Sequence, residues 1–242
     1  MQKKDRYVSD IAILGHSGEK FSVEYGKVEF SGGGCFQIYG DGTLTIDNLV
    51  NKKDYAIVPY EIQVIGNAGE DGKDGQQGEE GESGHPGTST EVHIHIGYLS
   101  NSIVVYSVGG DGGKGGRGGD GQNGGDGGDA AQVNEKYECG GSGGDGGDGG
   151  DGQNGGNGGN GGKGPLVTIT CDARADGAEI TTLAECSNGG DGGDGGNGGK
   201  GGKGGRNSDG SYAREGRAGR RGMKGISGLQ GEPGEFQLNF TE

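Results

Sequence analysis

The chain has 242 residues and a formal net charge of −15, and 67 of its residues are glycine. Only 26% of the residues are hydrophobic, so an apolar core has to come from the parts of the chain that are not glycine-rich. The acidic charge argues against nucleic acid and anionic membranes as partners, and no apolar run is long enough to insert into a bilayer. The first residues contain no apolar segment of a secretory signal, so we expect synthesis in the cytoplasm.

Residues 1–65 predict a small β-rich N-terminal domain. Phe21, Val23 and Tyr25 alternate with polar residues, and the same alternation recurs in several short runs up to residue 64. Turns are expected at 32–34 and 41–42, where glycines interrupt the pattern.

Five glycine-rich tracts with a period of three follow. Three repeat Gly-Gly-X (109–129, 140–163 and 189–206) and two repeat Gly-X-X (66–87 and 216–234). A strict period of three is typical of a polyglycine II helix, which has three residues per turn. We therefore expect about five antiparallel polyglycine II helices, with Gly144 facing a neighbouring helix and Asp145 solvated. A disordered linker is the alternative for all tracts, and collagen-like trimerisation is the alternative for the two Gly-X-X tracts.

The long connections 88–108 and 165–188 are β-like. Residues 91–97 and 102–108 flank one turn, and 166–171 and 179–183 flank another that contains Asp176-Gly177. We expect these two β-hairpins to form a distal cap together with residues 236–240. The predicted organisation is thus a domain at 1–65 and a glycine-rich unit at 66–242, with the cap and the N-terminal domain at opposite ends.

No group of residues predicts catalysis, a metal or a cofactor. Ser/His/Asp and Cys/His arrangements have no local support, so we expect no enzyme activity. His93 and His95 share one face of a predicted strand without an evident third ligand, which favours solvent-facing histidines over a metal site. The four cysteines lack a C-x-x-C spacing and are expected to be free thiols, with a Cys171–Cys186 pair left open.

The three Gly-Gly-X tracts, GGDGGKGGRGGDGQNGGDGGD, GGSGGDGGDGGDGQNGGNGGNGGK and GGDGGDGGNGGKGGKGGR, are separated by non-repetitive connections behind a distinct N-terminal region. This arrangement resembles the tail-fibre tip adhesins of T-even-like bacteriophages over about residues 66–236. The resemblance implies a polyglycine II sandwich, a location in the virion tail, and connections at the far end that bind a bacterial surface protein or glycan. The Gly-Gly-X bundle is also similar to the snow flea antifreeze protein, which makes ice binding a further alternative.

The predicted function is therefore a non-enzymatic binding protein, with a structural partner at the N-terminal domain and recognition at the cap. The alternative is a bacterial structural or protein-interaction scaffold, in which the turns only close the hairpins and the protein stays in the cytoplasm. Loops on a rigid scaffold are where binding usually occurs. The exposed candidates in the two turns are Tyr98, Leu99, Ser100, Asn101, Asp172, Arg174 and Asp176.

Overall fold

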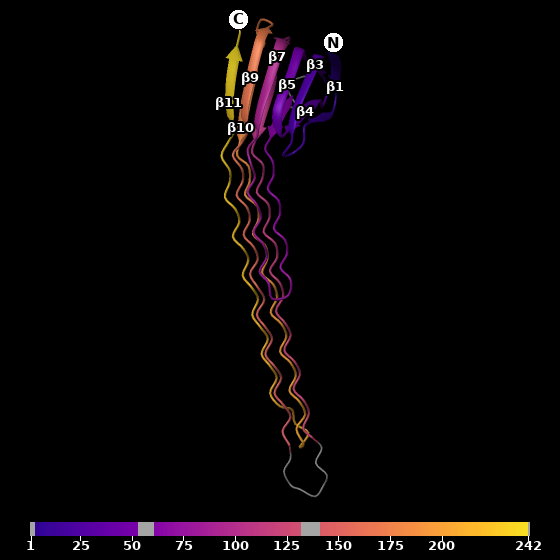
Figure 1. Cartoon of the computed structure of the whole chain (residues 1–242), viewed down its shortest axis with the longest axis vertical. Helices are drawn as coiled ribbons and strands as arrows, with labels where there is room; N and C mark the ends of the chain where they lie inside the picture. The colour runs from indigo at the N-terminus through magenta and orange to yellow at the C-terminus, as the bar shows by residue number, and fades with distance from the viewer. Residues whose placement is uncertain (1–2, 53–60, 132–140, 242) are drawn as a thin grey trace.

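The computed structural model describes residues 3–52, 61–131 and 141–241, which form a β-sheet head and a long glycine-rich rod (Figure 1). All strands of the described residues lie in the head, including the first and the last. The rod projects from one end of the head, which we call the rod end, and we call the opposite end the tip.

The head consists of two parallel sheets. The order in sheet A is β1 (Lys4–Val8), β3 (Lys20–Phe30), β5 (Asp41–Asn51), β7 (Glu91–Leu99), β9 (Leu166–Arg174) and β11 (Glu235–Phe240). The order in sheet B is β10 (Ile180–Glu185), β8 (Ile103–Val108), β6 (Ile62–Ile65), β4 (Cys35–Tyr39) and β2 (Ile11–Leu14). The chain alternates strand by strand between the sheets, so it winds as a two-sided β-solenoid in which each coil adds one strand to each sheet.

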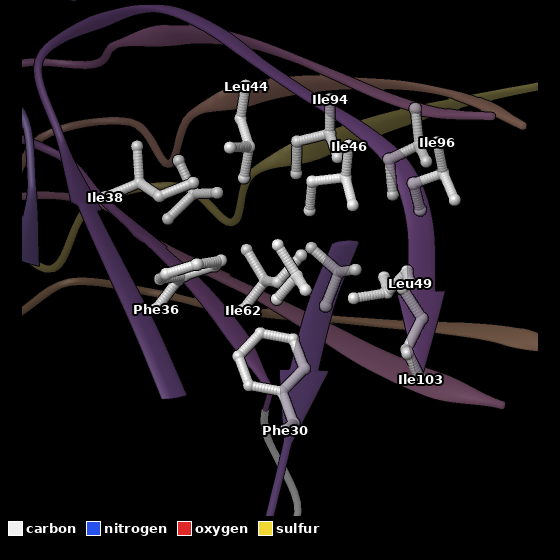
Figure 2. Close-up of a cluster of buried hydrophobic side chains, with 14 of the residues drawn as sticks. Phe30, Phe36, Ile38, Leu44, Ile46, Leu49, Ile62, Ile94, Ile96 and Ile103 are labelled. Carbon is white, nitrogen blue, oxygen red and sulfur yellow. The ribbon is translucent and has the colours of Figure 1, made fainter. Parts of the chain in front are cut away.

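The core lies between the two sheets. Along each strand every second side chain points inward, so Leu44 and Ile46 of β5 and Ile94 and Ile96 of β7 are buried. They face Phe36, Ile38, Ile62 and Ile103 from sheet B, and Phe30 closes the cluster (Figure 2). Neighbouring coils place like residues side by side, so that Ile46 pairs with Ile96, which pairs with Cys171. The core is therefore a stack of short apolar rungs.

The rod consists of three excursions from the rod end of the head. They are the connections from β6 to β7 (66–90), from β8 to β9 (109–165) and from β10 to β11 (186–234). Each excursion has a descending limb (66–77, 109–131, 186–206) and an ascending limb (79–90, 141–165, 211–234). The first reverses at Gly78 and the third at Gly210, both at positive φ, while the reversal of the second lies outside the described residues.

The predicted fold class is wrong. The described residues form an all-β fold of two parallel sheets, and the glycine-rich segments belong to no helix or strand, so a bundle of five polyglycine II helices is not what the structure shows. Tract 66–87 is not one helix, because it reverses at Gly78. The β-hairpin cap is also absent from the described residues, since β7 and β8 lie in different sheets, as do β9 and β10.

The expected separation of the N-terminal strands from the cap is also wrong. β5 pairs with β7 and β6 pairs with β8, so strands before and after residue 65 share the same two sheets. A two-residue alternation is the same in parallel and antiparallel strands, and therefore it identified strands without identifying their partners. Paired strands such as β7 and β9 are separated in the sequence by a whole excursion. Strands that are close in the sequence, such as β7 and β8, therefore suggest a hairpin although they do not pair.

Backbone hydrogen bonds join the rod segments at every third residue. Descending limbs bond to descending limbs, as in Gly72 N–H to Lys114 O at 2.7 Å, and ascending limbs to ascending limbs, as in Gly149 N–H to Arg217 O at 2.8 Å. Other bonds cross between the two sets, such as Gly147 N–H to Gly125 O at 2.8 Å. The rod thus repeats the arrangement of the head: two layers, each with its segments in chain order.

The Asp and Asn side chains of the tracts also join neighbouring segments. Asp120 Oδ1 accepts the N–H of Asn197 at 2.7 Å, and Asp148 Oδ1 accepts the N–H of Arg217 at 2.6 Å. The side chains that accept in this way are Asp71, Asp74, Asp111, Asp120, Asn123, Asp126, Asp129, Asp145, Asp148, Asp151, Asn154, Asn157 and Asn160. Asp145, which we expected to be merely solvated, is one of them.

Candidate functional site

The tip of the head collects the turns that we predicted to carry recognition. Sheet A runs from the rod end to the tip and sheet B runs back, so each A-to-B turn lies at the tip (Figure 1). The turn after β7 contains Ser100 and Asn101, and the turn after β9 contains Asp176. Tyr98 pairs with Ala173 and Leu99 pairs with Arg174, so the two turns are neighbours.

The first turn exposes only part of what the sequence predicted. Tyr98 and Asn101 are exposed and Ser100 is half-buried, but Leu99 is fully buried in the core. Leu99 was wrong as an exposed candidate, because the inward alternation of β7 continues to the end of the strand. The Ser100 hydroxyl donates to Asn48 Oδ1 at 3.2 Å, and the Ser100 N–H donates to Leu49 O at 2.9 Å. These bonds fix the turn onto β5.

Asp172 is the centre of a polar group on the outer face of sheet A. Its Oδ1 accepts from the Thr241 hydroxyl at 2.9 Å, and its Oδ2 lies 2.8 Å from His95 Nε2. The Thr241 hydrogen bond, followed by that to His95, holds the pKa of the Asp172 carboxyl below its ordinary value. Asp172 is therefore ionised at neutral pH and ties β7, β9 and the end of β11 together.

Arg174 lies at the mouth of a cleft beside this group. Its guanidinium carbon is 4.7 Å from the centre of the Phe240 ring, and its Nη1 donates to Ala178 O at 3.1 Å. The cleft has a volume of about 500 Å³ and lies between the turn after β9 and the end of β11. Asp172, Arg174 and Asp176 all line it, so the second set of candidates is brought together.

A buried polar group that the sequence did not indicate supports the first turn. Glu61 is fully buried, and its two carboxylate oxygens accept from Asn51 Nδ2 and from the Val104 N–H, both at 2.8 Å. Asn51 Nδ2 also donates to Ser102 O at 3.0 Å. A carboxylate removed from water has to be hydrogen-bonded, so this arrangement holds the turn to the ends of β5 and β6. The only sequence signal for a buried carboxylate here is the position of Glu61 directly before the apolar run of β6.

The remaining candidates for chemistry lie apart. His93 is exposed and has Glu91 at 3.3 Å, and among residues 3–52, 61–131 and 141–241 no group of His, Cys, Asp and Glu is placed to hold a metal ion. Cys171 and Cys186 are free thiols rather than a pair, and Cys139 lies outside the described residues. Burial raises the pKa of the Cys171 thiol, which keeps it protonated at neutral pH. Within the described segments there is no helix of the length and apolarity that a membrane crossing requires.

No protein-family model matches the chain, and comparison with curated proteins and with solved structures finds no similar protein.

Proposed function

We propose that this chain is a non-enzymatic binding protein, similar in role to a tail-fibre tip adhesin, whose tip recognises a protein or glycan on a bacterial surface. The observation that carries the proposal is the gathering of Asn101, Asp172, Arg174 and Asp176 at the end of the head farthest from the rod. Loops on a rigid sheet scaffold are common binding sites.

The electrostatic character of the tip favours a polar partner. Three carboxylates, those of Asp172, Asp176 and Glu179, and the guanidinium of Arg174 line the cleft. Sugar hydroxyls and polar loops of an outer-membrane protein both fit groups that donate and accept hydrogen bonds. The rod separates this surface from its far end (Figure 1). In this proposal the structural partner therefore binds the far end of the rod and not residues 1–65.

The test compares the chain with a tip variant, Asn101→Ala/Arg174→Ala/Asp176→Ala, in binding to a panel of intact bacterial cells and isolated envelope fractions. Leu99, Ser100 and Asp172 are left unchanged, because their contacts support the fold. A variant of the outer face of sheet B, Gln37→Ala/Gln63→Ala, is the control. We expect at least a tenfold loss of affinity for the tip variant and no change for the control.

A protein that binds no cell or envelope fraction would refute the adhesin proposal, and so would a tip variant that binds like the original chain. The scaffold or spacer function would then take its place. That second candidate is favoured by the continuous hydrogen bonding of the rod, which suits a rigid spacer whatever the head does.

A further inference from the structure

The two sheets of the head do not end together at the C-terminal side. Sheet A has six strands and sheet B has five, so β11 extends one strand beyond β10. No described strand occupies the position next to β10 and opposite β11, which we call the open position. Among the described residues, the last coil thus has a strand in sheet A and none in sheet B.

The side chains around the open position are those of a core. Phe236, Leu238 and Phe240 of β11 pair with the buried Val167, Ile169 and Cys171 of β9, so they belong to the inward face of sheet A. Nevertheless 41% of Leu238 and 44% of Phe240 remain exposed. On β10, Ile180, Thr182 and Ala184 pair with the buried Ile103, Val105 and Ser107 and likewise face inward.

The strand edges at this side are unprotected. Between them β10 and β11 carry Glu185 and Glu235 as their only charged residues, both at the rod end, and Glu235 is paired with Lys163. At the opposite side of the head, β1 exposes Lys4, Asp5 and Arg6, and β2 has only four residues. Charged side chains and short strands are the means by which edge strands avoid pairing with other chains, and the C-terminal side lacks them.

We propose that a second copy of this chain fills the open position, in a two-fold dimer whose axis runs along the strands between β11 and its counterpart. A rotation of 180° about this axis keeps the strand direction and exchanges the sheets. It places the β11 of the second copy beside β10, where it runs antiparallel to β10. Each copy fills the open position of the other, and the inward faces of both β11 strands close one continuous core.

The simpler arrangement, a head-to-tail stack of copies, does not fill the open position. A head-to-tail stack would place β1 of the next copy beside β11 and β2 one coil too far from β10, because the N-terminal side of the head has both strands of its coil. The open position would then stay empty. Of these two arrangements, only the two-fold dimer completes both sheets, and an isologous contact of this kind closes instead of forming filaments. In it the two rods leave the head in the same direction.

The first measurement is the mass of the chain in solution by sedimentation at micromolar concentration. We expect about 48 kDa, which is twice the 24.2 kDa of one chain. Leu238→Lys places a charge in the shared core and should give a monomer, whereas Gln237→Lys, on the outward face of the same strand, should leave the dimer intact. Leu238→Ala/Phe240→Ala removes the apolar contact without a charge, and we expect at least a tenfold weaker dimer, with circular dichroism to verify that the sheets persist.

Small-angle scattering distinguishes the direction of the rods. Rods side by side give the dimer about the same longest dimension as the Leu238→Lys monomer, whereas opposed rods would nearly double it. A chain that is still a monomer at about 100 µM, a concentration at which a contact of micromolar affinity is nearly saturated, overturns the proposal. A dimer indifferent to both β11 variants, a filament, or a dimer with opposed rods overturns it as well. None of these outcomes bears on whether the tip binds bacterial cells.

Discussion

At the scale of single residues, the Asp and Asn side chains of the rod are acceptors with a defined partner. Each Oδ1 reaches the N–H of a residue in the next limb, over 77 residues for Asp120 and over 69 for Asp148. A side chain one methylene longer places its oxygens differently, which explains in physical terms why the X positions of the Gly-Gly-X tracts use Asp and Asn and not Glu. The sequence showed the composition but not this contact, because the partner lies in a separate tract.

Asp148→Ala should therefore destabilise the rod, while Asp148→Asn, whose amide Oδ1 can accept the same hydrogen bond, should be nearly neutral. One net hydrogen bond contributes about 0.5–1.5 kcal/mol, and exposure to water places this one at the lower end. Chemical denaturation of both variants measures the difference. Equal unfolding midpoints for Asp148→Ala and Asp148→Asn would contradict the role of the side chain.

Asp172 provides a residue-scale prediction that depends on pH. Because its pKa in the folded chain lies below the ordinary value of 3.8, its contacts stabilise the fold above that value and are lost as the pH falls through the lower folded pKa. Thr241→Val removes the largest cause, so the pKa of Asp172 should rise towards 3.8. Titration of the carboxyl carbon by NMR measures it, with Thr168→Val on the same sheet face as the control. An unchanged pKa in Thr241→Val would show that Thr241 does not hold the carboxylate.

At the scale of elements, the rod limbs pack so closely that most of their glycines have no room for a side chain. A Cβ on Gly146 would lie 2.1 Å from Gly202 O in the third excursion. A Cβ on Gly144 would meet nothing nearer than Gly128 N at 3.4 Å, an ordinary contact. Our expectation that Gly144 is a crowded position was wrong, since the crowded glycine of its triplet is Gly143, whose Cβ would lie 2.6 Å from Gly205 O.

Gly146→Ala should consequently cost about 1–3 kcal/mol through overpacking, and Gly144→Ala much less. The two substitutions are matched in chemistry and lie in the same limb, so differences in unfolded-chain entropy cancel between them. Thermal unfolding of both variants tests the packing. If Gly144→Ala lowered the melting temperature as much as Gly146→Ala, the limbs would not approach each other in the way described.

At the scale of the whole molecule, the sequence predicted the strands better than their arrangement. The predicted run 91–97 lies within β7 and 166–171 within β9, because alternation of apolar residues depends only on which face is buried. Their pairing depends on contacts across excursions such as 109–165, and no local pattern encodes those. At the tip, the turns with Asn101 and Asp176 were found because turn chemistry is local, whereas Glu61 and its partners were missed because burial of a carboxylate is a property of the assembled core.

The division into an apolar head and a rod held by hydrogen bonds has a consequence for heat capacity. Unfolding raises the heat capacity mainly through newly exposed apolar surface, by about 12–15 cal/mol/K per residue in ordinary domains. The Gly-Gly-X tracts have no apolar side chains to expose, so their melting contributes far less per residue than that of the head. The free energy of unfolding of the head therefore depends on temperature along a curve and decreases on strong cooling, whereas that of the rod changes almost linearly. On cooling, the head should consequently lose its packing before the rod does.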